Sequence, residues 1–402
     1  MTQITGFASQ FRLFVAAMAC LICAAAAADD GSVGIVSKQV FTTHDFETFN
    51  GASIAEVSVG WEAYGQLNER KDNVVLITHF FSGNSHAAGR YDPDDALPGY
   101  WDSIIGPGKA IDTNKYYVIS SDTLVNQEPH NPMVTTTGPA SINPATGQPY
   151  ALDFPVVTIR DFVNVQKALL DSLGVTRLHA VVGASMGSLQ ALDWATAYPD
   201  FVQRVISVIG GGAVDPWTIA TLQQWANPII ADPNWNNGDY YQGDAPLVGL
   251  RQALGMVTLQ AMHPMMFNQI YAASGPRETA PLQDIRADFT VVQQLNAAAE
   301  ARTRFADANH VLYLVRANQL YMAGFSETLG AGLAPVTAKT LFLPASNDLL
   351  LQPYLARTAH ETLVGLGKRS AYEEIEGPWG HLDGVYLIDQ KADLIEDFLN
   401  TD

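Results

Sequence analysis

Ser185 lies at the centre of a Gly-x-Ser-x-Gly pattern that spans residues 183–187. A serine in this pattern can act as a nucleophile when the chain turns sharply from a strand into a helix, because the turn exposes its hydroxyl and admits only small residues on either side. The apolar run at residues 178–182 predicts a buried strand, and the pattern at residues 186–198 predicts a helix. This context favours a nucleophilic Ser185 over a plain glycine–serine turn.

A serine hydroxyl needs a neighbouring base, and the base needs a group that fixes its tautomer. Two residues near the C-terminus follow predicted strands and can fill these roles, His381 as the base and Asp348 as the group that fixes its tautomer. The chain order serine, acid, histidine is the one expected when the serine follows a strand of a parallel sheet. We expect His381 to take the proton of Ser185 and return it to the leaving group, while Asp348 orients the imidazole ring. Asp215 and Glu376 are the alternatives for the acid.

A tetrahedral intermediate also needs two N–H donors for its negative oxygen, which together form an oxyanion hole. The backbone N–H of Met186 can supply one, because this residue begins the helix after the nucleophile. The loop after the predicted strand at residues 74–78 should supply the other, and we expect Phe81 in that role. His79 and His86 lie in the same loop, where His79 is expected to make a structural hydrogen bond rather than to act in catalysis.

The sequence predicts no metal and no cofactor. Residues 92–95 include three aspartates but lack a regular ligand spacing, so a solvated loop is the better interpretation. The chain has no glycine-rich phosphate loop, which argues against nucleotide-driven chemistry. Both cysteines, Cys20 and Cys23, lie within the first 28 residues, so the rest of the chain is expected to have neither thiolate chemistry nor a disulfide framework.

Buried strands and helices alternate along most of the chain, which predicts an α/β fold with a mostly parallel sheet flanked by helices. Residues 33–64 carry β-type patterns and should form the antiparallel edge of that sheet. The other strands are expected at residues 74–78, 116–121, 178–182, 205–209, 340–344 and 371–375. Because the carboxyl ends of parallel strands meet at one edge, Ser185 and Phe81 should lie on the same side of the sheet.

Residues 215–330 interrupt this alternation. Helical patterns follow one another there with no clear strand, at residues 216–229, 247–262, 288–304 and 311–323. A helical insertion before the last strands is typical of a lid over the catalytic face. The predicted domains are a core of residues 29–214 and 331–402 and a lid of residues 215–330. Several aromatic residues of the lid can line an acyl pocket or, more commonly, pack inside the lid: Trp217, Trp225, Trp235, Tyr240 and Tyr241.

The first 28 residues predict a cleaved secretory signal peptide. Arg12 precedes an apolar stretch at residues 13–27, and small residues come directly before Asp29. The stretch is shorter than the roughly 20 residues of a membrane span, although a retained N-terminal anchor stays an alternative. We therefore expect a periplasmic or secreted protein with no stable membrane association after signal cleavage.

The composition restricts the partners. The chain has 402 residues, 48% of them hydrophobic, and a formal net charge of −19. Nucleic acids and anionic membranes are polyanions and would repel such a chain. A small-molecule ester is the expected partner, and the sequence leaves open whether the protein forms a homodimer.

Five segments carry a family resemblance, namely residues 79–83, 105–113, 137–144, 153–161 and 183–187. They resemble the homoserine O-acetyltransferase group of α/β-hydrolases, and the likeness runs from Phe41 to the C-terminus. The resemblance implies the α/β-hydrolase fold and acyl-serine chemistry on Ser185, with Asp348 and His381 completing a catalytic triad. It also implies an oxyanion hole at Phe81 and Met186.

The same resemblance marks differences around the predicted pocket. The family helix that aligns with residues 249–262 carries an arginine that grips the amino-acid carboxylate and a tyrosine further along, but these places hold Leu254 and Ala261 here. Arg251 would point to a different face, and the end of the family's histidine motif is altered here, to His381-Leu382-Asp383-Gly384. A carboxylate without its bidentate partner binds poorly in a dry pocket, and an exported enzyme would lack acetyl-CoA. We therefore expect a serine ester hydrolase for a small or medium acyl ester. An O-acyltransferase is the first alternative, and a non-catalytic binding protein is the second.

Overall fold

The computed structural model describes residues 31–271 and 278–401. The predicted signal peptide, residues 1–28, and both cysteines lie outside these residues, so the expectation of export stays a prediction. Within the described ranges, no helix combines the length and the apolar composition that a membrane crossing requires.

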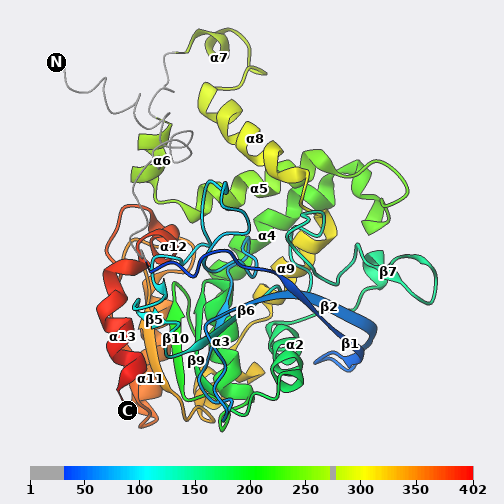
Figure 1. Ribbon diagram of the computed structural model, residues 1–402. Helices are drawn as coiled ribbons and strands as arrows, with labels where there is room; N and C mark the ends of the chain where they lie inside the picture. The colour runs from blue at the N-terminus through cyan, green and yellow to red at the C-terminus, as the bar shows by residue number, and fades with distance from the viewer. Residues whose placement is uncertain (1–30, 272–277, 402) are drawn as a thin grey trace, which may run out of the picture.

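A central sheet organises the molecule (Figure 1). Its eight strands lie in the order β1 (Gln39–Glu47), β2 (Ser53–Tyr64), β6 (Tyr117–Ser121), β3 (Val74–Thr78), β9 (Leu178–Ala184), β10 (Arg204–Val208), β11 (Lys339–Leu343) and β12 (Ser370–Tyr372). The six strands from β6 to β12 are parallel, and β2 and β1 form an antiparallel edge beside β6. This confirms the predicted mostly parallel sheet and its antiparallel edge.

Apolar side chains cover both faces of the sheet. In β3, Val74 and Leu76 join one buried cluster, and Val75 and Ile77 join a second cluster on the opposite face. Every residue of β3 is buried, which is why the strand reads as one continuous apolar run. The covering helices are α2 (Ile159–Ser172), α3 (Met186–Ala197) and α11 (Pro353–Gly365) on the first cluster, and α12 (Asp383–Tyr386) and α13 (Ala392–Asn400) on the second.

Helix α2 begins at a capping box. The carboxylate of Asp161 accepts hydrogen bonds from the backbone N–H groups of Thr158 and Phe49, both at 2.6 Å. These bonds fix the entry into the helix and tie it to the loop between β1 and β2. The cap explains why the helix starts at Ile159.

The segment between β6 and α2 is mostly irregular. Within it β7 (Ile142–Asn143) and β8 (Gln148–Pro149) form a short antiparallel pair. Earlier in the chain, β4 (Ile105–Gly106) and β5 (Ile111–Asp112) form a short parallel pair. Neither pair belongs to the central sheet.

The chain between β10 and β11 forms a helical insertion, and no strand occurs among its described residues. Its helices are α4 (Pro216–Ala231), α5 (Leu247–Ala261), α6 (Pro264–Ile270), α7 (Thr279–Gln283), α8 (Thr290–Thr303), α9 (Ala308–Gln319) and α10 (Leu329–Leu333). The sequence patterns did not predict α6, α7 or α10. Figure 1 shows α4, α5 and α8 stacked above the sheet. That the insertion acts as a lid stays a prediction.

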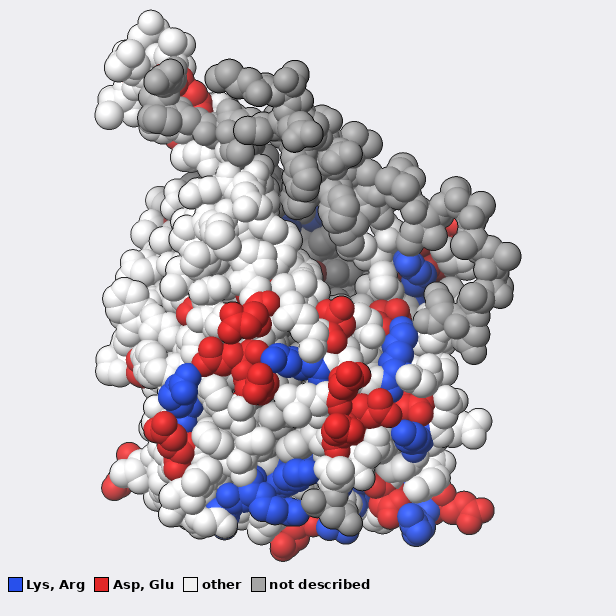
Figure 2. Space-filling model, turned by 90° about the vertical axis from the view of Figure 1, so that its left-hand side faces the viewer, with Lys and Arg blue, Asp and Glu red and all other residues white. Residues whose placement is uncertain are grey.

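Charged side chains are spread unevenly over the surface. Figure 2 shows acidic and basic side chains interspersed over the lower part of the molecule, whereas the described region above them has few. Helices α5 and α6 together contain one charged residue, Arg251. These two helices of the insertion are thus largely uncharged.

Candidate active site

Ser185 lies between the end of β9 and the start of α3 in a backbone conformation that few residues adopt. Its φ is 56° and its ψ is −120°. A positive φ is costly for a residue with a side chain and persists only where the surroundings fix it. The N–H of Ser185 donates to the carbonyl of Val208 at 2.9 Å, and its own carbonyl accepts from the N–H of Ser188 at 2.8 Å. The structure therefore has the predicted strand, sharp turn and helix around this serine.

The two glycines of the pattern allow β3 to approach the turn closely. A Cβ atom added to Gly183 would lie 2.1 Å from Oγ1 of Thr78, and one added to Gly187 would lie 2.0 Å from the Thr78 carbonyl oxygen. The Thr78 hydroxyl donates to the carbonyl of Gly187 at 2.7 Å. Because packed interiors leave no space for such overlaps, a larger residue at either position would push β3 away from Ser185.

The structure brings Ser185, Asp348 and His381 together. Nε2 of His381 lies 2.7 Å from Oγ of Ser185, and Nδ1 of His381 lies 2.6 Å from Oδ2 of Asp348. All three residues are buried. The other oxygen of Asp348 accepts from the N–H groups of Leu350 at 2.8 Å and Leu351 at 3.0 Å, so the carboxylate cannot turn away from the ring. A hydroxyl, an imidazole and a carboxylate in this line can activate the hydroxyl for attack on a carbonyl carbon.

The alternative acids lie elsewhere. The Asp215 side chain caps α4, accepting from the N–H of Thr218 at 2.8 Å, and Glu376 accepts from the hydroxyl of Ser346 at 3.0 Å. Asp383 accepts from backbone N–H groups of the turn that precedes it. Of the acids weighed from the sequence, Asp348 is the one whose carboxylate meets His381.

The two expected oxyanion donors flank the nucleophile. Met186 is the first residue of α3, so its N–H has no acceptor within the helix. Phe81 follows β3, and its side chain lines the pocket beside Ser185 and His381. The N–H of Phe81 donates to no other described residue. Both N–H groups are thus free to bind a ligand oxygen.

His79 precedes Phe81 but does not reach the pocket. Its side chain is fully buried, and Nδ1 lies 2.8 Å from the carbonyl oxygen of Phe80. Burial lowers the pKa of His79, which favours the neutral ring. This neutral ring packs behind the loop, and His86 bonds to Glu62 rather than to any residue of the pocket.

A pocket opens beside the catalytic candidates, and its walls are mostly apolar. Its lining residues are Phe80, Phe81, Ser82, Ser185, Leu189, Ile209, Val214, Leu222, Trp225, Val257, Ala261, Asn318, Leu350, Leu351, His381, Leu382 and Val385. None of these lining residues is Lys, Arg, Asp or Glu. An ionic group in this pocket would therefore lose its water without gaining an ionic partner from these walls.

The positions at which the resemblance predicts a difference lie at or near the pocket. Ala261 and Leu382 line it, and Leu254 is buried in α5. Arg251 does not line the pocket, and its guanidinium lies 3.4 Å from the carboxylate of Glu300 in α8. The structure agrees with the expectation that Arg251 points to a different face.

The aromatic residues singled out in the insertion lie in the pocket wall, in the core of the insertion or at the surface. Trp225 lines the pocket, and its ring meets the ring of Phe81 edge to face at 5.2 Å. Trp235 donates to the Asn309 side chain at 2.9 Å, and two tyrosines donate to Asp307 in the core of the insertion. Trp217 is 62% exposed and contributes to neither.

Metal ligands do not cluster in the described part of the chain, where no group of three or more His, Cys, Asp or Glu side chains could hold an ion. In the aspartate-rich loop, Asp95 accepts from the N–H groups of Tyr91 at 2.9 Å and Asp92 at 2.8 Å. These bonds close a turn.

The sequence patterns missed a set of buried charged residues behind the Phe81 loop. Glu62 is fully buried in β2, and Asp122 directly follows β6. Lys38 reaches both carboxylates. A carboxylate within a run of apolar strand residues was the available signal, because a buried charge requires partners.

Comparisons with known proteins agree with this geometry. The chain matches the family model described as alpha/beta hydrolase fold over residues 97–385. A homoserine O-acetyltransferase from Methanococcoides burtonii is 38% identical, over 87% of this chain and 71% of the relative. The homoserine O-acetyltransferase from Symbiobacterium thermophilum is 39% identical, over 85% of this chain and 87% of the relative.

Two crystal structures are similar over nearly the whole described chain. Esterase E22 is 56% identical with a TM-score of 0.90, over 91% of this chain and 100% of that one. Homoserine O-acetyltransferase from Bacillus anthracis is 37% identical with a TM-score of 0.88, over 91% of this chain and 98% of that one. The chain therefore belongs to the homoserine O-acetyltransferase-like family of α/β-hydrolases, and it is an enzyme of the serine hydrolase and acyltransferase class.

Proposed function

We propose that this enzyme hydrolyses a carboxylic ester with a small or medium acyl group, through an acyl intermediate on Ser185. The observation that carries the proposal is the line from Ser185 through His381 to Asp348, with contacts of 2.7 and 2.6 Å, at the edge of an apolar pocket. In this proposal Asp348 completes the triad, and Phe81 and Met186 supply the oxyanion hole.

The first step forms the acyl-serine. Nε2 of His381 accepts the hydroxyl proton as Oγ of Ser185 bonds to the ester carbonyl carbon. The carbonyl oxygen becomes an oxyanion, and the N–H groups of Phe81 and Met186 stabilise it. The carbon–oxygen bond to the alcohol then breaks, and the imidazolium of His381 gives its proton to the departing alcohol oxygen.

The second step returns the serine. A water molecule gives a proton to His381 as its oxygen bonds to the acyl carbon, through a second oxyanion in the same place. The bond to Oγ of Ser185 breaks, the serine recovers the proton from His381, and a carboxylic acid leaves. Asp348 stabilises the imidazolium in both steps.

The character of the pocket supports water as the acceptor. An amino-acid acceptor would bring a carboxylate into walls that contain no Lys or Arg, with Ala261 and Leu382 at two of the altered positions. A charged group without a partner in a dry site costs several kcal/mol. The 56% identity to a protein named esterase E22 supports the same conclusion.

Acetyl transfer to homoserine is the second candidate. The curated relatives are homoserine O-acetyltransferases, and their names support transfer more than they support hydrolysis. Both reactions share the acyl-serine and differ in the acceptor that attacks it. The choice between them depends on whether homoserine can compete with water.

Product analysis separates the two. The purified protein is incubated with a simple acetyl ester, with and without homoserine, and in parallel with acetyl-CoA and homoserine. Hydrolysis predicts acetate at a rate that homoserine does not change. Formation of O-acetylhomoserine at the expense of acetate, or turnover only with acetyl-CoA, would establish the transferase instead. No turnover and no labelling of Ser185 by a fluorophosphonate would indicate a non-catalytic binding protein.

A further inference from the structure

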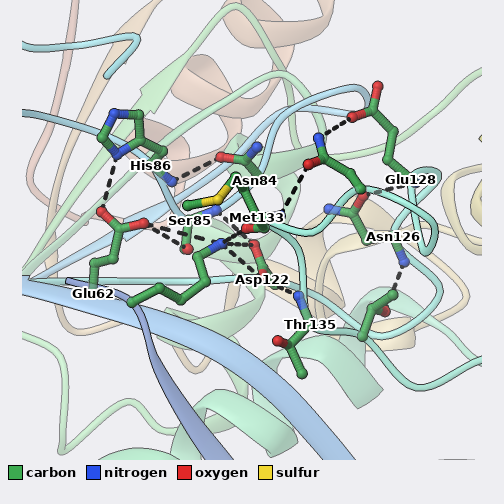
Figure 3. A network of polar contacts seen from close by, with 12 residues as sticks. Glu62, Asn84, Ser85, His86, Asp122, Asn126, Glu128, Met133 and Thr135 are labelled. Atoms are coloured by element: carbon green, nitrogen blue, oxygen red, sulfur yellow. Dashed lines mark hydrogen bonds and ion pairs between the residues drawn. The ribbon is translucent and has the colours of Figure 1, made fainter. Parts of the chain in front are cut away.

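A buried polar cluster contacts Gly83, Ser85 and His86, which follow Phe81 in the chain (Figure 3). Its charged members are Lys38, Glu62 and Asp122, and neither of the two acidic residues lines the pocket. Glu62 and Asp122 are 0% and 1% exposed. A charge buried away from water costs free energy unless fixed partners neutralise it or bond to it. The partners of these two carboxylates therefore show which parts of the chain the carboxylates hold in place.

Asp122 joins three separate parts of the chain. Oδ1 accepts from the backbone N–H of Ser85 at 2.8 Å, and Oδ2 accepts from the backbone N–H of Thr135 at 2.9 Å. The ammonium of Lys38 lies 3.1 Å from Oδ2. The sheet leaves room for this carboxylate, since a Cβ atom on Gly60 would lie 2.4 Å from Oδ2.

Glu62 holds the next residues of the same loop. Its carboxylate accepts from the hydroxyl of Ser85 at 3.1 Å and from the hydroxyl of Tyr64 at 2.9 Å, and it lies 3.1 Å from Nδ1 of His86. The hydroxyl of Tyr91 donates to it as well. In Figure 3 His86 and Ser85 both point toward Glu62.

Other hydrogen bonds also hold this loop in place. Asn126 donates to the carbonyl of Gly83 at 2.9 Å, and the Tyr64 hydroxyl accepts from the N–H groups of Ala87 and Ala88. The N–H of Gly83 donates to the carbonyl of Phe80 at 2.9 Å and closes the turn. The polar cluster therefore anchors residues 83–88, immediately after the turn that presents the N–H of Phe81.

We propose that Asp122 and Glu62 are positioning residues, which hold the loop so that the N–H of Phe81 meets the oxyanion. Asp122 makes the larger contribution. This inference rests on the proposed function, because it assigns the polar cluster to the oxyanion hole of that reaction. A donor displaced by about 1 Å can cost about 100-fold in rate, so a fixed loop has a direct effect on catalysis.

The chemistry of the partners predicts an order of effects. The Asp122 partners are backbone N–H groups and an ammonium, which can only donate. In Asp122→Asn the amide NH₂ would face at least one of these donors, and that N–H would lose its acceptor. The Glu62 partners are mostly hydroxyls and an imidazole, which can turn or change tautomer and accept from a Gln amide. Asp122→Asn should therefore be more harmful than Glu62→Gln.

The test compares catalysis with binding of a tetrahedral mimic. For each variant, kcat and KM are measured with a simple acetyl ester, together with the inhibition constant of a trifluoromethyl ketone, which forms an oxyanion adduct on the nucleophilic serine. Asp122→Asn should lower kcat and weaken the ketone in parallel, each by about 10- to 100-fold, with KM changed little. Glu62→Gln should show a smaller effect of the same kind.

Asp161→Asn is the matched control. Asp161 is also a fully buried carboxylate that accepts from two backbone N–H groups, but it caps α2 away from the loop. It should lose thermal stability while keeping the wild-type kcat and ketone affinity. If Asp122→Asn behaves like this control, the positioning role is overturned, and if Asp122→Asn does not fold, Glu62→Gln decides by the same comparison. A wild type with neither turnover nor ketone binding would instead overturn the proposed function.

Discussion

At the scale of single residues, the contacts of His381 define the chemistry. Its two ring nitrogens lie 2.7 Å from the Ser185 hydroxyl and 2.6 Å from the Asp348 carboxylate, so the ring can take the hydroxyl proton while the carboxylate stabilises the resulting imidazolium. Asp348 is itself held by two backbone N–H groups. The orientation of the ring is therefore fixed before any substrate binds.

The sequence predicted these residues to different degrees. Ser185 follows from its glycines and from the strand and helix around it, and His381 follows from its place after the last strand. The acid does not follow in this way, because Asp215, Asp348 and Glu376 all come after strands. Only the folded contact to Nδ1 of His381 distinguishes them.

Asp348→Asn tests the assignment of the acid. The amide can hold His381 in the wrong tautomer, and kcat for an acetyl ester should fall by about 10³- to 10⁴-fold with little change in KM. Asp215→Asn is the control, since Asp215 caps α4 and does not touch His381. It should cost about 1 kcal/mol of stability or less and leave kcat near wild type. Steady-state kinetics showing the opposite order would move the role to Asp215.

At the scale of elements, fully buried strands were the best predicted. β3 matches its expected bounds, and β9 and β10 match within two residues, because burial on both faces leaves an unbroken apolar run. The short helices α6, α7 and α10 were missed. Each has fewer than two full helical turns, which is too short for a periodic hydrophobic pattern to show. The buried charges of Glu62 in β2 and of Asp122 directly after β6 were missed because their partners are distant in sequence.

Helix α5 provides a prediction about the molecule that accepts the acyl group. Arg251→Gln should leave kcat/KM for an acetyl ester unchanged, because Arg251 pairs with Glu300 outside the pocket. A partly exposed ion pair of this kind contributes about 1 kcal/mol or less to the free energy of unfolding. Val257→Ala, on the same helix but in the pocket wall, should change kcat/KM. A large rise in KM for homoserine caused by Arg251→Gln would contradict this account and favour the transferase.

At the scale of the whole molecule, His310 joins the insertion to the segment after β6. This fully buried ring lies in α9 with Nδ1 2.7 Å from the carbonyl oxygen of Asn126, and its Nε2 accepts from the N–H of Ala140 at 3.2 Å. Since Nε2 accepts, Nδ1 must donate and the ring must be neutral. Burial lowers the pKa of His310, although the nearby Asp307 opposes the shift.

This contact predicts acid sensitivity. A pKa below the ordinary value of 6.5 in the folded state means that the unfolded chain takes up the proton first as the pH falls. The stabilisation is complete above pH 6.5 and is lost below it, by up to about 1.4 kcal/mol per pH unit for this group. Urea unfolding at pH 7.5 and 5.5 should show lower stability at pH 5.5.

Two variants test whether His310 causes this loss of stability at low pH. His310→Gln should be less stable than wild type at pH 7.5 but should lose less between the two pH values, because it has no ring to protonate. His44→Gln, at an exposed histidine of β1, should retain the wild-type difference. An unchanged difference in His310→Gln would show that another group causes the acid sensitivity.

Covalent labelling of the nucleophile tests the central claim most directly. The protein is treated with a fluorophosphonate, and the modified residue is located by peptide mass spectrometry in the wild type and in Ser185→Ala. The account predicts one added group on Ser185 in the wild type, none in Ser185→Ala, and loss of ester turnover in both. A label on another residue, or ester turnover that persists in Ser185→Ala, would contradict it.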